Sequence, residues 1–224
     1  MQKVLITTAT FGGHPSQNHV GQSTSCDYKT YSDDNYPSRS LSLSPRLKSR
    51  IPKVLEWEFS DYDYYIWIDS KFQIRSPKFV EWMIDSLGDS DICLFKHPYL
   101  SSIREEAAFI NEGMSRGDKY LLDRWLGEGI DRQVAHYLAT DGFTDDNLFA
   151  SGLFIYSKNL VKNRRSNLMT SWMLEIVKYC LRDQLSLPFL LWRDNIKFSV
   201  FDVGMFENDY VSYDWAVCRS EIYW

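Results

Sequence analysis

Short apolar, β-branched runs alternate with amphipathic stretches along this chain of 224 residues. Runs typical of strands occur at residues 4–9, 64–68, 91–96, 148–156 and 198–201, and the Tyr and Thr residues of 26–31 predict a further strand although its alternation is poor. Apolar residues at helical spacing predict helices that begin near residues 45, 77 and 103 and others across 118–140 and 167–181. We expect Pro52 to end the first helix, and the residues after 202 show no clear pattern. This alternation predicts an α/β fold, with a mostly parallel sheet and helices on both of its faces.

The strand predicted at residues 64–68 ends in an abrupt change of polarity. Its aromatic and β-branched side chains are followed by Asp69, Ser70 and Lys71, and then by apolar residues again. A carboxylate is costly to bury, and open α/β sheets bind their ligands at the carboxyl ends of the strands. Asp69 is therefore either a site residue or a capping residue whose ion-pair partner is Lys71.

Two turns near the N-terminus carry further candidate residues. Gly12 and Gly13 end the first strand, and glycines there let the backbone approach a ligand closely, although no dinucleotide-binding motif follows. Asp33 and Asp34 follow the second strand. They indicate either ordinary turn chemistry or a contact with a nucleoside.

Three cations lie close together at the start of the first predicted helix. Ser44-Pro45 is a typical helix start, and Arg46, Lys48 and Arg50 follow it. The cluster is either a solvated helix face or a cationic wall that binds a diphosphate.

Three later segments also contain candidate site residues. His97 follows the strand at 91–96 and Arg104 opens the next helix; the imidazole can equally be structural. Ser151-Gly152 gives the strand at 148–156 a centre without bulk, so we expect a group to approach the backbone there. Arg182-Asp183-Gln184 lies between two apolar runs and indicates either an internal salt bridge or a polar cluster at a pocket.

Composition excludes several classes of protein. The net charge of −5 argues against non-specific electrostatic binding of nucleic acid. The four cysteines are far apart, which disfavours a zinc site and is typical of free thiols. No leader pattern and no apolar run long enough to span a bilayer occurs, so we expect a single cytoplasmic domain over residues 1–224.

Several of these segments together resemble one family. The shared pattern comprises Thr8-Ala9, Phe11-Gly12-Gly13, Ser32-Asp33-Asp34, the basic stretch 46–52, the run 61–71, His97-Pro98, 104–107, Ser151-Gly152-Leu153 and 182–186. It resembles the TOD1/MUCI70 glycosyltransferase-like family, a former domain of unknown function, over roughly residues 4–195. The plant members of that family act in polysaccharide synthesis in the Golgi, and its bacterial and phage-type members are short soluble chains. The resemblance implies a GT-A-like, Rossmann-related fold that binds a nucleotide-sugar donor and a glycan acceptor.

The resemblance also implies roles for individual residues. The end of the first strand, with Thr8, and Asp33 or Asp34 would face the nucleoside. Asp69 would occupy the first position of the Asp-x-Asp pattern that usually holds Mn²⁺ or Mg²⁺. The remaining members of the implied substrate site are Arg46, Lys48, Arg50, His97, Arg104, Ser151, Gly152, Arg182 and Gln184, with Asp183 as either a general base or a group that positions the sugar.

This chain departs from the Asp-x-Asp pattern, because Lys71 stands at its third position. A lysine and a divalent cation repel each other in a partly dry pocket, and an ammonium can itself neutralise a departing diphosphate. We therefore expect that no metal cofactor is required, with a metal on Asp69 as the alternative.

Two other functions stay open at this level. A sugar nucleotidyltransferase would need a basic phosphate loop after the first strand, which the turn at Gly12 lacks. A glycan-binding or catalytically degenerate module would explain the missing second acidic residue. The sequence does not indicate the donor, the acceptor, the stereochemical outcome or the oligomeric state.

Overall fold

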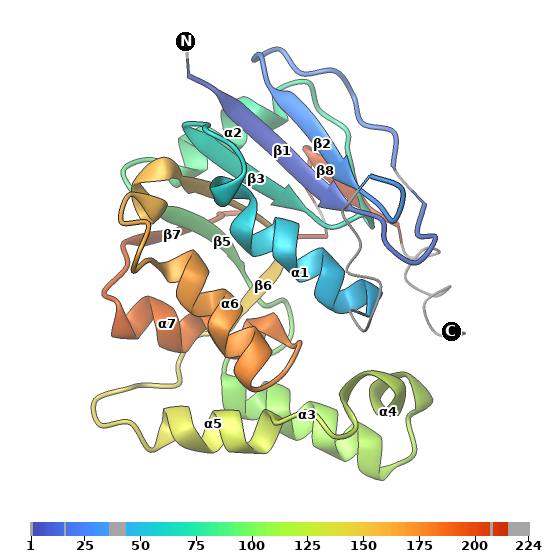
Figure 1. The fold of residues 1–224 in the computed structure, drawn as a ribbon, viewed down its shortest axis with the longest axis vertical. Helices are drawn as coiled ribbons and strands as arrows, with labels where there is room; N and C mark the ends of the chain where they lie inside the picture. The colour runs from blue at the N-terminus through green and yellow to red at the C-terminus, as the bar shows by residue number, and fades with distance from the viewer. Residues whose placement is uncertain (1, 16, 36–43, 207, 215–224) are drawn as a thin grey trace.

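The computed structural model of the protein describes residues 2–15, 17–35, 44–206 and 208–214. Within these ranges, seven α-helices surround a six-stranded sheet (Figure 1). The strands of this sheet are, in spatial order, β2 (Asp27–Tyr31), β1 (Val4–Ala9), β3 (Tyr64–Ile68), β6 (Phe149–Ser157), β5 (Ile92–Lys96) and β7 (Phe198–Val200). A second, two-stranded sheet pairs β4 (Phe72–Ile74) with β8 (Val211–Tyr213).

The main sheet is mixed but mostly parallel. β1 pairs in parallel with β2 and β3, and β5 pairs in parallel with β7. β6 alone among the described strands of this sheet runs antiparallel to its neighbours, β3 and β5. The predicted α/β class and the mostly parallel sheet are therefore confirmed.

The central strand β3 is apolar on both sides because both faces of the sheet are covered. Tyr65 and Trp67 pack in one core, which includes residues of α1 (Pro45–Leu55), α6 (Leu168–Lys178) and α7 (Leu187–Arg193). Ile66 and Ile68 pack in the other, against α2 (Phe79–Leu87). Figure 1 shows α2 behind the sheet and the other three helices in front of it.

The remaining helices lie together at one end of the sheet, in the lower part of Figure 1. They are α3 (Ile103–Ser115), α4 (Lys119–Trp125) and α5 (Ile130–Leu138). The side chain of Ser102 accepts a hydrogen bond from the backbone N–H of Glu105 and so caps the start of α3. These helices bring residues from the middle of the chain up to the strand ends.

One expectation about the elements was wrong, and two elements were not predicted. α1 does not end at Pro52 but continues to Leu55, because Lys53 and Val54 are buried and packing offsets the lost backbone hydrogen bond. The apolar run after residue 186 forms a helix, α7. The tail after residue 202 contains β8, which is too short to be recognised without its partner strand.

Neither a disulfide nor a membrane-spanning helix occurs among the described residues. Cys26, Cys93 and Cys180 are unbridged, whereas Cys218 lies outside the described residues, as do residues 36–43 of the Ser- and Pro-rich stretch. None of the helices within the described ranges combines the length and the apolar character needed to cross a bilayer.

Candidate functional site

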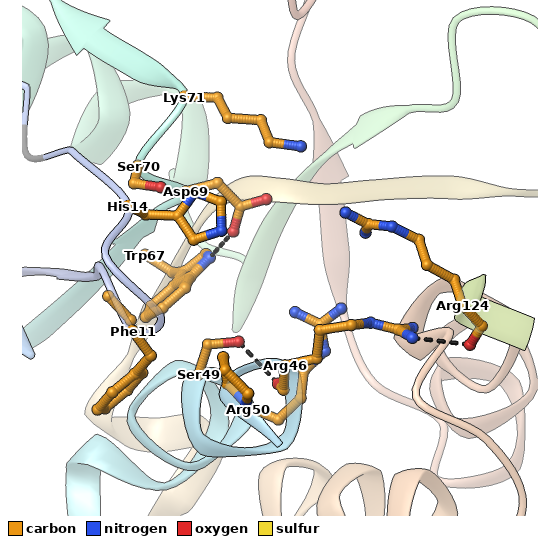
Figure 2. A pocket seen from close by; sticks show the side chains of 12 residues that line it. Phe11, His14, Arg46, Ser49, Arg50, Trp67, Asp69, Ser70, Lys71 and Arg124 are labelled. Carbon is orange, nitrogen blue, oxygen red and sulfur yellow. Dashed lines mark hydrogen bonds between the residues drawn. The ribbon is translucent and has the colours of Figure 1, made fainter. Parts of the chain in front are cut away.

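Two adjoining cavities lie where β1 and β3 end. The first cavity is lined by Ala9, Phe11, His14, Pro45, Arg46, Ser49, Arg50, Trp67, Asp69, Ser70, Lys71 and Arg124 (Figure 2). The second cavity is lined chiefly by Lys53, His97, Tyr99, Tyr120, Ser151, Gly152, Arg182, Asp183, Gln184, Phe206 and Tyr213. Arg50, Asp69, Lys71 and Arg124 line both, so the two cavities form one groove.

Asp69 lies at the junction of the two cavities, and its neighbours fix its position. Its backbone N–H donates to the carbonyl oxygen of Gly152 over 2.8 Å, which extends the pairing of β3 with β6. The indole N–H of Trp67 donates to Asp69 Oδ1 over 2.7 Å (Figure 2). Trp67 and Asp69 are two residues apart, so they point to the same side of the extended chain. The carboxylate is therefore held in the wall of the groove.

Gly152 is a glycine because protein side chains occupy the space beside it. A Cβ atom at this position would lie 3.1 Å from Phe72 Cε2 and 3.2 Å from Asp69 Oδ2. The group expected to approach the backbone here thus comes from the protein itself. The absence of a side chain at residue 152 lets Asp69 lie directly against β6.

Arg46 is a half-buried cation, and one of its guanidinium nitrogens is buried without a hydrogen bond to the described residues. Its Nη1 donates to the backbone carbonyl of Arg124 over 2.7 Å, and its guanidinium lies 4.2 Å from the ring centre of Trp125. Its Nη2 has no hydrogen-bond partner within the described part of the chain. Burial, together with repulsion from Arg124 and Arg50, lowers the pKa of Arg46 to about 10. An anion bound here would relieve both the repulsion and the missing hydrogen bond.

Basic side chains outnumber acidic ones among the described residues that line the first cavity. Figure 2 shows the charged ends of Arg50, Lys71 and Arg124 around the space beside Asp69, whereas the guanidinium of Arg46 extends toward the backbone carbonyl of Arg124. These four cations face one carboxylate among the residues that line this cavity. Such a charge balance favours a ligand with more than one negative charge.

A buried ion pair forms part of the wall of the second cavity. Lys53 Nζ lies 2.6 Å from Asp183 Oδ2, and the two side chains are only 1% and 4% exposed. Lys53 also donates to Ser151 Oγ over 3.2 Å, and Arg50 Nε lies 3.4 Å from the same oxygen of Asp183. Burial opposes ionisation of Asp183, but Arg50 and Lys53 outweigh it and hold the pKa of this carboxyl well below its usual range. Asp183 is therefore a charged anchor for two cations.

The other polar residues of the second cavity differ in their partners. Arg182 is paired with the buried carboxylate of Glu106, so its charge is already compensated. Gln184 is 8% exposed, and its Oε1 has no hydrogen-bond partner among the described residues. An unpaired buried acceptor is unfavourable until a ligand supplies a donor.

Ten of the residues expected at a site line the groove, and five do not. Those in the groove are Arg46, Arg50, Asp69, Lys71, His97, Ser151, Gly152, Arg182, Asp183 and Gln184. Thr8 is buried within β1, Arg104 is exposed on α3, and Asp34 is exposed on its turn. Lys48 donates to Asp33 over 2.7 Å, so these two residues neutralise each other outside the groove.

Two cations of the groove were missed by sequence reasoning. Lys53 follows Arg46 and Arg50 at positions i+7 and i+3, so helical spacing places all three on one face of α1 and Lys48 on another. That signal was present in the sequence. Arg124 comes from the end of α4, and only the tertiary structure brings it to α1.

Within the described part of the chain, the side chains around Asp69 offer too few ligands for a divalent cation. Among the described residues, no three side chains of His, Cys, Asp or Glu are arranged to hold a metal ion. Mn²⁺ and Mg²⁺ need several oxygen ligands, whereas the charged neighbours of Asp69 in the first cavity are Arg46, Arg50, Lys71 and Arg124.

Comparisons with known proteins agree with this architecture. A family model described as "TOD1/MUCI70, glycosyltransferase-like domain" matches residues 39–213. Among solved structures, the apo structure of the WbbM bifunctional glycosyltransferase is similar over 89% of this chain, with a TM-score of 0.53 and 9% identity. The similarity covers 39% of that chain, so our chain corresponds to a part of it, and at this identity the likeness concerns the fold. No curated protein matches the chain in sequence.

Proposed function

Because this chain belongs to the TOD1/MUCI70 glycosyltransferase-like family, we propose that it transfers a sugar from a nucleoside diphosphate sugar to a hydroxyl group of a glycan acceptor. The observation that carries this proposal is the cation cluster of the first cavity. A diphosphate has two or more negative charges and many acceptor oxygens, which match the charge excess and the unpaired Nη2 of Arg46.

The two cavities suggest how donor and acceptor are arranged. We place the diphosphate in the first cavity, against Arg46, Arg50 and Arg124, and the sugars in the second. The bond between the sugar and the diphosphate would then break at the junction, where Asp69 and Lys71 line both cavities. Thr8, Asp33, Asp34, Lys48 and Arg104 have no place in this arrangement.

We propose that the reaction does not depend on a metal ion. As the bond to the departing diphosphate breaks, negative charge develops on its oxygens. Lys71, with the arginines of the first cavity, is positioned to stabilise that charge, and fixed cations require no reorganisation during the step. The side chains around Asp69 offer no alternative ligand set among the described residues.

Asp183 has a positioning role in this mechanism rather than that of a general base. A base should have a pKa near the working pH, whereas Arg50 and Lys53 hold the pKa of Asp183 well below its usual range. Its carboxylate also holds Lys53, which in turn holds the hydroxyl of Ser151. The proton of the acceptor hydroxyl would then pass to Asp69 or to the departing diphosphate.

The test uses purified protein and a panel of UDP-, GDP- and dTDP-sugars in excess EDTA. We expect one donor to raise the midpoint of thermal unfolding and to be hydrolysed slowly, since a ligand of the native state stabilises it by mass action. Loss of both effects in EDTA, restored only by Mn²⁺ or Mg²⁺, would overturn the metal-independent mechanism.

A matched pair of variants tests the site of the diphosphate. Arg46→Met should weaken donor binding at least ten-fold, because it removes a buried charge-assisted donor. Arg116→Met is the control, since Arg116 is 70% exposed and lies on α3 outside both cavities. Glycan binding without any nucleotide binding would instead favour the glycan-binding module.

A further inference from the structure

We propose that His97, Tyr99 and Gln184 form a subsite that binds a pyranose ring of the acceptor, by stacking and by hydrogen bonds between uncharged groups. This inference rests on the proposed function, because it assigns the acceptor to the second cavity. All three residues line that cavity. They lie on its wall together with Ser151 and Arg182, next to the junction at Asp69.

Tyr99 is a highly exposed aromatic residue in this wall. Its side chain is 76% exposed, although the ring is large and apolar. It lies in the short loop between β5 and α3, where it contacts His97 edge-on at a ring distance of 6.2 Å. An exposed ring on a fixed loop is suited to pack against the C–H face of a sugar, and tyrosine offers large contact area with little loss of side-chain entropy.

The loop that carries Tyr99 is held by His97. The Nδ1 atom of His97 accepts hydrogen bonds from the backbone N–H groups of Tyr99, over 3.4 Å, and Leu100, over 3.0 Å. The backbone N–H of His97 donates to the carbonyl of Leu148 over 2.8 Å. Since Nδ1 is an acceptor, the proton of the neutral ring is on Nε2. Burial lowers the pKa of His97, so the imidazole is a neutral donor.

Gln184 supplies the complementary acceptor. Its Oε1 is buried and has no hydrogen-bond partner in the described part of the chain. A sugar hydroxyl both donates and accepts, so a single hydroxyl or two neighbouring ones can satisfy Gln184 Oε1 and the N–H of His97. A phosphate or carboxylate has no hydrogen to donate and would leave Gln184 unpaired.

Two of the cations that line the second cavity are paired with buried carboxylates of the protein. Arg182 is paired with Glu106, and Lys53 is paired with Asp183. The junction residues Arg50, Asp69, Lys71 and Arg124 line both cavities. A neutral saccharide forms no ion pair with any of these groups, so acceptor binding should depend little on salt, whereas binding of the diphosphate should weaken as the salt concentration rises.

The experiment measures binding and transfer with neutral mono- to hexasaccharides of glucose, galactose, mannose, xylose and rhamnose. In isothermal titration, at least one saccharide should bind the wild-type protein with an affinity that changes less than two-fold between 50 and 300 mM NaCl, roughly as expected for uncharged groups. Tyr99→Ala should weaken this binding roughly ten-fold, and Tyr99→Trp should retain it.

A second variant separates recognition from folding. Gln184→Met removes the unpaired acceptor, so it should weaken saccharide binding without lowering the midpoint of thermal unfolding. Phe109→Ala is the control, because Phe109 is another exposed aromatic residue, 54% exposed, outside both cavities.

The outcomes distinguish this subsite from the proposed function. No binding by any saccharide, or full binding by both Tyr99→Ala and Gln184→Met, overturns the subsite even if a nucleotide-sugar is hydrolysed. Saccharide binding that is lost in both variants supports the subsite, and it does so even if no nucleotide-sugar is bound, a result that would overturn only the proposed transfer.

Discussion

Replacement of Lys53 by methionine tests the assignment of Asp183 as a charged anchor. The variant keeps most of the side-chain volume but removes the ammonium that lies 2.6 Å from Asp183 Oδ2. Removing one partner of a buried ion pair typically costs about 3–5 kcal/mol, because the remaining charge stays buried. Arg50 lies 3.4 Å from the same oxygen and keeps part of the compensation. We therefore expect Lys53→Met to lower the free energy of unfolding by about 3 kcal/mol, the lower end of this range.

The assay is urea unfolding at pH 7, followed by thermal unfolding. A loss of about 3 kcal/mol corresponds to a fall of roughly 6–12 °C in Tm for a chain of this size. Lys48→Met is the matched control on the same helix, since its partner Asp33 is 45% exposed and such surface pairs contribute about 0–1 kcal/mol. The double variant Lys53→Met/Asp183→Asn should be about 2 kcal/mol more stable than the sum of the two single variants predicts.

The effect of Lys53→Met on stability should depend on pH, which a loss of packing alone would not explain. The pKa of Asp183 is depressed in the folded protein, so its contribution to stability is present above the unfolded value of about 3.9 and is lost as the pH falls below it. The difference in stability between wild type and Lys53→Met should therefore be largest near neutral pH and should narrow below about pH 4. Additive single variants, with a difference that does not change with pH, would refute the anchor role.

Three further predictions concern the groove. Gly152→Ala should lower the free energy of unfolding in urea by about 1–3 kcal/mol and should displace Asp69 or Phe72. Gly21→Ala is the control and should leave stability unchanged, because nothing lies within 4 Å of its added Cβ. Trp67→Phe removes the N–H that donates to Asp69 Oδ1, so donor hydrolysis should fall while the Tm changes by only a few degrees, as for the loss of about one hydrogen bond. Pyrophosphate should raise the Tm in EDTA, and the rise should shrink in high salt; an equal rise at all salt concentrations would argue against the cation cluster as its site.

Sequence alone determined the local features of this protein. The start of α1 could be predicted because its capping hydrogen bond is local. The hydroxyl of Ser44 accepts a hydrogen bond from the backbone N–H of Leu47, only three residues later. The run from Tyr64 to Ile68 was recognisable as a buried strand because it is aromatic and β-branched throughout. Asp69 was readable as a site candidate because it is a carboxylate directly after that strand. Each of these signals spans only a few residues.

The tertiary structure decided how the distant segments meet. The direction of β6 depends on the route that the chain takes through α3, α4 and α5, which no local pattern records. Arg124 joins the cations of α1 only because α4 packs beside it, and Asp183 anchors two cations only because Lys53 and Arg50 reach it from α1. The pKa of a carboxyl depends on charges within a few ångströms in space, and those charges come from positions far apart in the sequence.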